Sequence, residues 1–175
     1  SAKYLQLAND LKLVICPSNP SEIFNKSKQL LIESDKNKIN QAEDTNFPES
    51  IFIIGMPRSG STLVESILSM RNDVYDLGEI NILEESFLEH KKTKQHLSFA
   101  ELYGKKVNNH TELKISTNKN LYNYQYTGII ATRIPNSKII HCYRNPLDNI
   151  LSIYRTYFAK GNQYSSSLVD SANVY

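Results

Sequence analysis

The chain has 175 residues, which is enough for one domain with one sizeable core. Hydrophobic residues make up 40% of it, charged residues 22% and aromatic residues 10%, which excludes a disordered, collagen-like or coiled-coil protein. The formal net charge of +2 is too small to indicate a nucleic-acid surface or a polybasic membrane anchor, so any anion site is expected to be local.

The cysteine spacing and the N-terminal sequence predict the cellular compartment of the protein. Cys16 and Cys142 have neither CxxC spacing nor histidines at ligand spacing, which argues against a disulfide framework and a zinc site. The opening SAKYLQLAND lacks the basic and apolar regions of a signal peptide, and no run approaches the ~18 apolar residues of a membrane span. We therefore expect a cytoplasmic protein that has no membrane span and binds no metal.

The beginning of the chain predicts a segment of its own. Apolar residues scattered among Lys, Asn and Ser over residues 4–32 predict one or two short amphipathic helices. The sequence PSNP at 17–20 predicts a turn between them, with Ser21 as the N-cap of the second helix. A polar stretch that is typical of a linker follows. We expect a boundary near residue 48, which divides the chain into 1–48 and 49–175.

From Ile51 onward the pattern changes to strands that alternate with helices. An apolar run at 51–54 predicts a buried strand, the run at 138–143 predicts a second strand, and the alternating run at 113–117 predicts a third. Helices are expected at 62–70, 79–90 and 124–133, and from Pro146 onward. This alternation predicts an α/β fold with a parallel sheet.

The sharpest motif is GMPRSGST at residues 55–62, between a predicted strand and a predicted helix. It has the G-x-x-x-x-G spacing of a phosphate-binding loop, but Ser61 replaces the lysine that follows the second glycine. Glycines let backbone N–H groups converge on one anion, and the helix N-terminus adds about half a positive charge. Ser61 and Thr62 add hydroxyl donors, and Arg58 adds a planar cation suited to a phosphate or sulfate oxygen. The alternative is a Gly/Ser-rich turn without a ligand.

A second motif, YRNPLDNILSIY at 143–154, follows the strand predicted at 138–143. Arg144 stands at the carboxyl end of that strand, and Ser152 lies in the helix that follows. Parallel sheets bind ligands at this edge, so the two side chains are expected to share a further phosphate. The alternative for Arg144 is a solvated charge or an ion-pair partner. A nucleotide triphosphatase needs the loop lysine and an acidic residue for Mg²⁺, whereas this strand ends in a cation, so we expect an anion site without a metal.

Together the two motifs resemble the sulfotransferase superfamily, whose donor is 3′-phosphoadenosine 5′-phosphosulfate (PAPS). The first looks like the family's 5′-phosphosulfate loop and the second like its 3′-phosphate motif, in the family's order, over about residues 50–160. The chain is most similar to the bacterial, tyrosylprotein-sulfotransferase-like group, which is associated with tetratricopeptide (TPR) repeats. The resemblance implies a P-loop-containing, doubly wound parallel sheet flanked by helices, with 3′,5′-ADP as product. It also implies that residues 1–45 are a remnant of such repeats or a docking segment.

The resemblance implies roles for individual residues. The donor-binding residues would be Arg58, Ser59, Gly60, Ser61, Thr62, Leu63, Arg144 and Ser152. Arg58 would also neutralise charge on the sulfuryl group during transfer. Glu79, in the sequence DLGE, is the candidate base that removes the acceptor's proton. Lys119 is the candidate cation at the bridging oxygen of the leaving group.

Alternatives remain for several of these residues. Glu79 also suits a helix start, where it would interact with the helix dipole, and Lys119 also suits a polar surface loop. His90 and His110 are weaker candidates for the base. An acceptor cleft has three candidate lining residues, which are Tyr122, Tyr124 and Tyr126.

The acceptor class stays open at this point. A hydroxyl on a small molecule, carbohydrate, lipid or peptide fits the resemblance, and no nucleic-acid partner is expected. Two rival functions are a P-loop kinase or nucleotide triphosphatase, and a non-catalytic nucleotide-binding scaffold. The residues left after the N-terminal segment are few for a doubly wound domain, which predicts a domain truncated at its C-terminus that binds its donor weakly.

Overall fold

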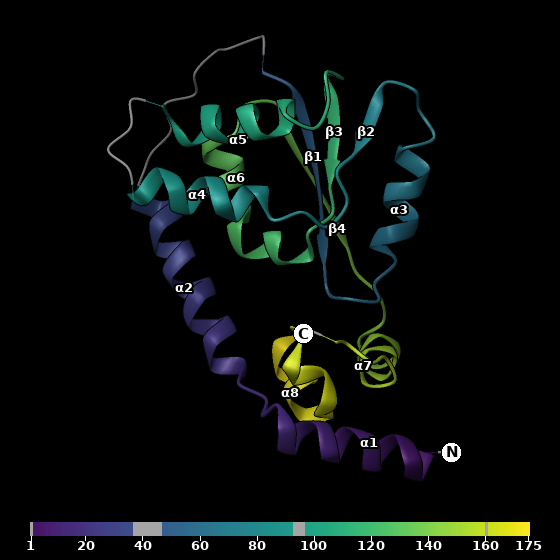
Figure 1. The fold of residues 1–175 in the computed structure, drawn as a ribbon. Helices are drawn as coiled ribbons and strands as arrows, with labels where there is room; N and C mark the ends of the chain where they lie inside the picture. Colours follow the sequence, from purple (N-terminus) through teal and green to yellow (C-terminus); the bar gives the residue numbers. More distant parts are fainter. Residues whose placement is uncertain (1, 37–46, 93–96, 160) are drawn as a thin grey trace.

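The structure is a computed structural model that describes residues 2–36, 47–92, 97–159 and 161–175 (Figure 1). In chain order its elements are α1 (Ala2–Ile15), α2 (Pro20–Lys36), β1 (Glu49–Gly55), α3 (Ser61–Leu68), β2 (Val74–Asp76), α4 (Ile82–Lys92), α5 (Phe99–Asn108), β3 (Ile115–Asn118), η1 (Leu121–Tyr126), α6 (Thr127–Arg133), β4 (Ser137–Cys142), α7 (Pro146–Tyr154), η2 (Gln163–Ser166) and α8 (Leu168–Val174), where η marks a 3₁₀ helix. No helix within these described ranges is long and apolar enough to cross a membrane.

The strands form a fully parallel sheet in the order β2-β3-β1-β4. The central strand β1 pairs with β3 on one side and with β4 on the other, with Phe52 opposite Ile139 and Asn118. All strands therefore end at the same edge, the lower edge of the sheet in Figure 1. The predicted α/β fold with a parallel sheet is confirmed.

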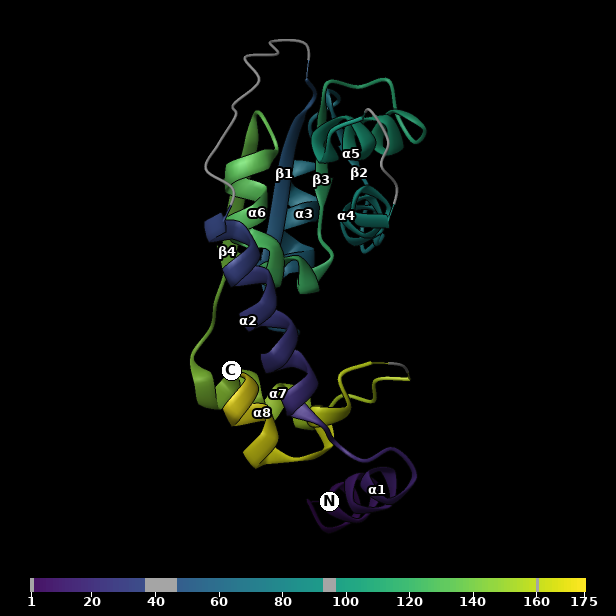
Figure 2. The ribbon, with the colours of Figure 1, turned by 90° about the vertical axis from the view of Figure 1, so that its left-hand side faces the viewer.

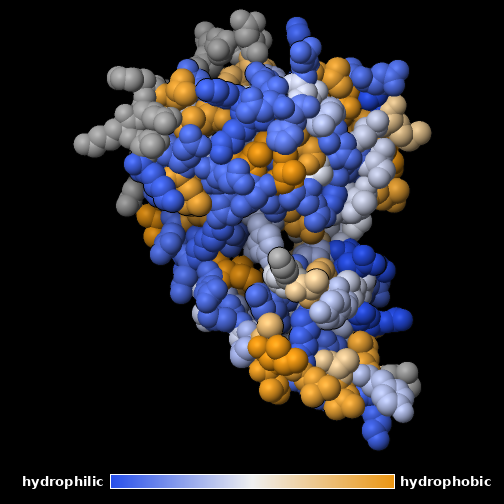
Figure 3. Space-filling model, viewed as in Figure 1, coloured by the Kyte–Doolittle hydropathy of each residue, from blue (hydrophilic) through white to orange (hydrophobic). Residues whose placement is uncertain are grey.

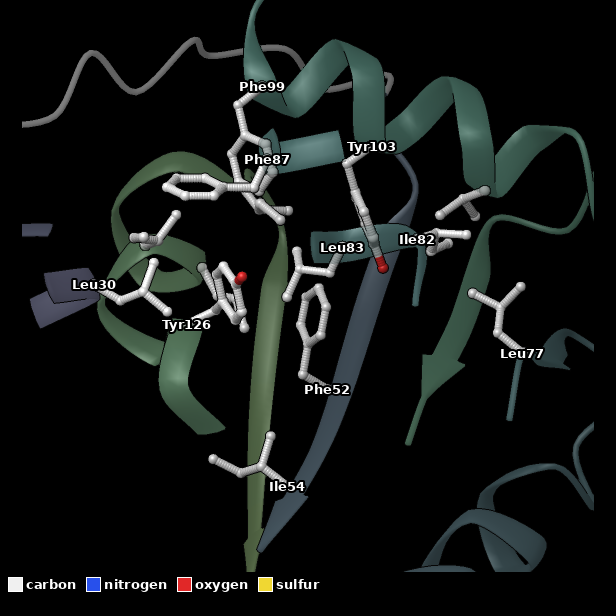
Figure 4. Packing of buried hydrophobic residues seen from close by; sticks show 14 residues of the cluster. Leu30, Phe52, Ile54, Leu77, Ile82, Leu83, Phe87, Phe99, Tyr103 and Tyr126 are labelled. Carbon is white, nitrogen blue, oxygen red and sulfur yellow. The ribbon is translucent and has the colours of Figure 1, made fainter. Parts of the chain in front are cut away.

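Helices cover both faces of the sheet because the side chains of β1 alternate between two apolar layers. Phe52 and Ile54 point into the larger layer, which is closed by α4, α5 and α6 (Figures 1 and 4). Ile51 and Ile53 point to the other face, where α3 contributes Val64. The other residues of the larger layer, drawn in Figure 4, are Leu30, Leu77, Ile82, Leu83, Phe87, Phe99, Tyr103, Val107, Tyr126, Ile129, Ile130 and Ile134. This two-sided covering is the expected doubly wound arrangement.

The N-terminal helices pack on the rest of the chain. Leu30 of α2 is buried in the larger apolar layer, and α2 runs beside α6 and η1 down to α8 (Figure 2). Asn9 and Lys12 of α1 donate hydrogen bonds to the carbonyls of Tyr154 and Phe158, both at 3.0 Å. The polar side of α1 thus faces inward. Its apolar side faces solvent, as the hydrophobic patch at the bottom of Figure 3 shows, through Leu7, Leu11, Val14 and Ile15.

The structure corrects several expected elements. Ser21 is not the N-cap of the second helix, because α2 already begins at Pro20, a residue whose fixed φ suits the first helical turn. The short strand β2 and the helix α5 were not expected. Helix α5 has a sequence signal, since Ser98 and Glu101 form a capping box at its start. The predicted linker lies for the most part outside the described residues.

Candidate active site at the carboxyl edge of the sheet

The loop between β1 and α3 is shaped by three residues with positive φ. Gly55 has a φ of 146°, and a Cβ there would lie 2.2 Å from the carbonyl oxygen of Cys142, so only glycine lets β1 end beside β4. Arg58 has a φ of 69°, and Gly60, the residue before α3, has a φ of 100°. The amide of Ser59 donates to the carbonyl of Met56 at 3.3 Å, which closes a tight turn. The loop therefore curls in front of the N-terminus of α3.

This loop holds unused hydrogen-bond donors. The hydroxyl of Ser59 is buried and has no partner among the described residues. Gly60 provides no side chain to cap α3, so the first amides of the helix lack a side-chain acceptor within the described structure. Ser61 is buried at the helix start, and Thr62 is exposed beside it. Amides and hydroxyls arranged in this way are the donor set that a phosphate or sulfate group requires.

The second motif lies against the first. The Nε of Arg58 donates to the Oγ of Ser152 on α7 at 3.4 Å. The buried amide of Asn149, also on α7, donates to the carbonyl of Pro57 at 3.0 Å. Helix α7 is fixed at its start by Asn145, whose side chain accepts from the amides of the first turn. Asn149 was not predicted as a site residue, although it lies within the motif at 143–154.

Two predicted donor-binding residues lie apart from these contacts. Arg144 is exposed in the connection between β4 and α7, and its carbonyl accepts a hydrogen bond from the hydroxyl of Tyr175 at 2.5 Å. Leu63 has an exposed side chain, and its amide donates to the carbonyl of Gly60 at 3.0 Å within the first turn of α3. A phosphate shared by Arg144 and Ser152 therefore stays a prediction.

A cavity of about 440 Å³ opens in front of the loop. Its lining combines the anion loop with one carboxylate and several aromatic rings: Gly55, Pro57, Arg58, Ser61, Thr62, Glu79, Asn120, Leu121, Tyr122, Tyr124, Phe158, Asn162 and Tyr164. Tyr126, the third tyrosine considered for an acceptor cleft, instead packs edge-on against Phe87 in the core. Of the described residues that line the cavity, none is a histidine, so His90 and His110 lie elsewhere.

Glu79, which lines this cavity, forms an ion pair with Lys119, which lies behind it. The Nζ of Lys119 donates to the Oε1 of Glu79 at 2.5 Å. Lys119 directly follows β3 and is 5% exposed, and its amide donates to the carbonyl of Gly78 at 2.8 Å. Asp76 accepts the amide of Gly78 at 2.7 Å, which fixes the turn that carries Glu79. The structure thus joins two residues that are far apart in the sequence.

Comparison with known proteins identifies the family. A sequence profile described as the sulfotransferase family matches residues 48–174. The chain belongs to this family. A relative in Aquifex aeolicus (strain VF5), described only as an uncharacterized protein, is 32% identical over 130 residues, which cover 62% of this chain and 17% of the relative. No solved structure matches the chain.

In this member of the sulfotransferase family, a buried carboxylate lies directly behind the Glu79–Lys119 pair. Glu65 of α3 is 3% exposed, accepts a hydrogen bond from the Oγ1 of Thr117 at 3.0 Å, and lies 3.9 Å from the Nζ of Lys119. Burial, aided by the nearby carboxylate of Asp76, raises the pKa of Glu65 to about 7 against the pull of Thr117 and Lys119. Glu65 was not predicted from the sequence, because a glutamate in a helix is usually exposed to solvent. Nothing in the sequence pattern of α3 marks this position as buried.

The cavity tyrosines are neutral hydrogen-bonding groups. Burial raises the pKa of Tyr124 to about 12 and also raises the pKa values of Tyr122 and Tyr164. The hydroxyls of Tyr122 and Tyr164 both donate to the Oδ1 of Asn162, at 2.9 and 3.0 Å. These rings therefore form an uncharged part of the cavity lining.

Proposed function

We propose that this chain transfers the sulfuryl group of PAPS to a hydroxyl acceptor by in-line displacement. The observation that carries the proposal is the position of Arg58. It lies in a phosphate-type loop, contacts the second motif through Ser152, and lines the same cavity as Glu79. A cation, an anion cradle and a carboxylate at one cavity are the groups that such a transfer needs.

The residues of the loop suit the donor. PAPS, when bound, supplies an activated sulfuryl group. The unpartnered hydroxyl of Ser59 and the uncapped amides at the start of α3 would hold its 5′-phosphosulfate. Ser152 and Arg144 would bind the 3′-phosphate, and the contact of Ser152 with Arg58 supports a common site for the two ends.

The transfer step assigns a task to each charged residue. The acceptor oxygen bonds to sulfur while the bond from sulfur to the bridging phosphate oxygen breaks. The proton of the acceptor hydroxyl passes to a carboxylate oxygen of Glu79. Arg58 stabilises the charge on the sulfuryl oxygens, and Lys119 stabilises the charge that develops on the departing phosphate, with 3′,5′-ADP as product.

We propose a separate role for the N-terminal helices. The family profile begins at residue 48, which supports a division into 1–48 and 49–175. Helix α2 contributes Leu30 to the core of the larger part, and α1 contacts the chain after α7. We therefore propose that residues 1–45 act as a docking segment, joined to the catalytic part through a shared core.

Calorimetry distinguishes this function from that of a kinase or nucleotide triphosphatase. We expect 3′,5′-ADP to bind weakly but measurably without metal, and Mg-ATP not to bind. The variant R58A tests the site, and R71A is its matched control, because Arg71 is exposed and pairs with Asp73 away from the cavity. Binding of Mg-ATP in preference to 3′,5′-ADP would reject the proposal.

A transfer assay distinguishes the enzyme from a scaffold. Donor carrying labelled sulfate is incubated with separate pools of small phenols and alcohols, carbohydrates, lipids and peptides. We expect label in one pool, and that pool identifies the acceptor class. Binding of 3′,5′-ADP without transfer to any pool would instead indicate a non-catalytic scaffold.

A further inference from the structure

A buried ionic network lies behind the wall of the cavity, between α3, β2 and β3. Its innermost member is Glu65, and the transfer step described above gives this residue no task. Removing a carboxylate from water is costly unless partners compensate it. The position of Glu65 therefore calls for a reason beyond packing.

The contacts of Glu65 point toward Lys119. One carboxylate oxygen accepts from the hydroxyl of Thr117 at 3.0 Å, which orients the group. The other lies 3.9 Å from the Nζ of Lys119, and this same Nζ donates to Glu79 at 2.5 Å. Lys119 thus stands between two carboxylates, one buried and one at the cavity.

This arrangement meets a requirement of the proposed transfer. While Glu79 is bound to Lys119, the ion pair occupies one oxygen of the carboxylate and one of the three hydrogens of the ammonium, so both groups are already partly engaged before transfer. If Glu79 moved away without a substitute, the buried ammonium would lose its nearest counter-charge. Glu65 is the remaining carboxylate within 4 Å of Lys119 in the described structure.

We propose that Glu65 is a positioning residue that acts as the second counter-ion of Lys119, so that Lys119 keeps its place and charge when Glu79 turns to the acceptor. Thr117 has a supporting role, because its hydroxyl fixes the carboxylate that faces Lys119. The inference rests on the proposed function, and it adds a residue that touches neither donor nor acceptor.

The protonation of Glu65 sets how strongly it can attract Lys119. Its surroundings raise its pKa to about 7, with burial as the largest cause. The groups that face it are Thr117 and Lys119 beside β3 and Asp76 on β2, with Glu79 on the far side of Lys119. Ionised Glu65 attracts the ammonium of Lys119 away from Glu79, whereas with neutral Glu65 the ammonium stays bound to Glu79. Transfer is therefore expected to rise with pH through this range.

Nuclear magnetic resonance of the whole chain with labelled lysine side chains tests the inference directly. The Cε and Nζ resonances of Lys119 are assigned by their loss in K119R. We expect them to move with pH with a midpoint near 7 in the parent, and to stay constant between about pH 6 and 8 in E65Q. The matched control is E84Q, which removes the carboxylate of a different Glu–Lys pair, formed with Lys26.

A second variant keeps the test valid if E65Q does not fold. T117V preserves shape and removes the hydrogen bond that lowers the pKa of Glu65, so the midpoint seen at Lys119 should move to higher pH. The inference is overturned if the Lys119 resonances of the parent do not respond to pH. It is also overturned if the Lys119 resonances of E65Q and of T117V show the same pH response.

The link to transfer is measured with the acceptor pool that accepts label. We expect E65Q to lower kcat about ten-fold or more while the KM for the donor stays within about two-fold, because Glu65 does not touch the donor. An unchanged kcat would disprove this link. Calorimetry with 3′,5′-ADP on the same samples separates the two levels. A parent that does not bind 3′,5′-ADP refutes the proposed function, whereas a parent that binds it without a Glu65-dependent response refutes only this inference.

Discussion

The guanidinium of Arg58 donates a hydrogen bond to the hydroxyl of Ser152 at 3.4 Å. This contact joins the loop after β1 to the helix after β4. The two residues are 94 positions apart in the sequence. It places a cation that can face a sulfuryl group next to a hydroxyl that can face a second phosphate. Both residues can be tested separately because their proposed tasks differ.

Replacing Arg58 should affect transfer more than binding. We expect R58A to lower the transfer rate by about 100-fold or more, since a charge-stabilising donor acts mainly in the transition state. The affinity for 3′,5′-ADP should fall only modestly, because this product lacks the sulfuryl group. Rate measurements and calorimetry on the same preparation check this, and R71A should match the parent in both.

Replacing Ser152 should affect binding more than transfer. We expect S152A to weaken 3′,5′-ADP binding about ten-fold, as loss of one hydrogen bond to a charged group implies. The control is S66A, because Ser66 is exposed on α3 and bonds only to the carbonyl of Thr62 in the described structure. Equal affinities of S152A and S66A would contradict the assignment.

The buried carboxylate should make stability depend on pH. The pKa of Glu65 is raised in the folded state. Its contribution to the free energy of unfolding is therefore fully present below pH 4.5, the pKa of the unfolded chain, and is lost as the pH rises through about 7. We expect this loss to be on the order of 2 kcal/mol and to be absent in E65Q. Urea unfolding at pH 5, 6, 7 and 8 measures it. E84Q should keep the slope of the parent, because the pKa of Glu84 is lowered and its contribution is lost only at more acidic pH.

Two glycines of the loop should differ in their tolerance of a side chain. G55A places a Cβ 2.2 Å from the carbonyl of Cys142, so β1 and β4 must separate, and we expect a loss of more than about 3 kcal/mol. G60A meets no atom within 4 Å and bears only the strain of its positive φ, which costs about 1 kcal/mol. Chemical unfolding of both variants checks the order, which would be wrong if G60A were the less stable.

Neighbouring leucines in α2 test whether this helix belongs to the core. Leu30 is 7% exposed, whereas Leu31 is 62% exposed. We expect L30A to destabilise the fold by about 2–4 kcal/mol and L31A by about 0.5 kcal/mol or less. A single unfolding transition in the parent, shifted as a whole in L30A, would show that α2 and the sheet unfold together. Two separate transitions would contradict a shared core.

The sequence was sufficient to predict the parallel α/β sheet and the loop at 55–62. Both depend on local signals, because a short run such as Ile51 to Ile54 that ends in glycine is typical of a strand buried on both faces, and glycines at fixed spacing mark the loop. The sequence did not predict β2, since a strand of three residues depends on its pairing with β3 and has little pattern of its own. The sequence also did not predict that the polar side of α1 faces inward, because the hydrogen-bond partners of this side are backbone carbonyls near the other end of the chain.

For the site, the sequence could name Arg58, Glu79 and Lys119 singly, but only the tertiary structure decided which side chains meet. Glu79, which follows β2, pairs with Lys119, which follows β3, and Glu65 lies behind this pair. The physical reason is that burial and ion pairing depend on distances between elements, which the spacing of residues along the chain does not contain. A glutamate in a helix has the same sequence pattern whether it is solvated or enclosed, and only the closure of β2, β3 and α3 around Glu65 decided that it is enclosed.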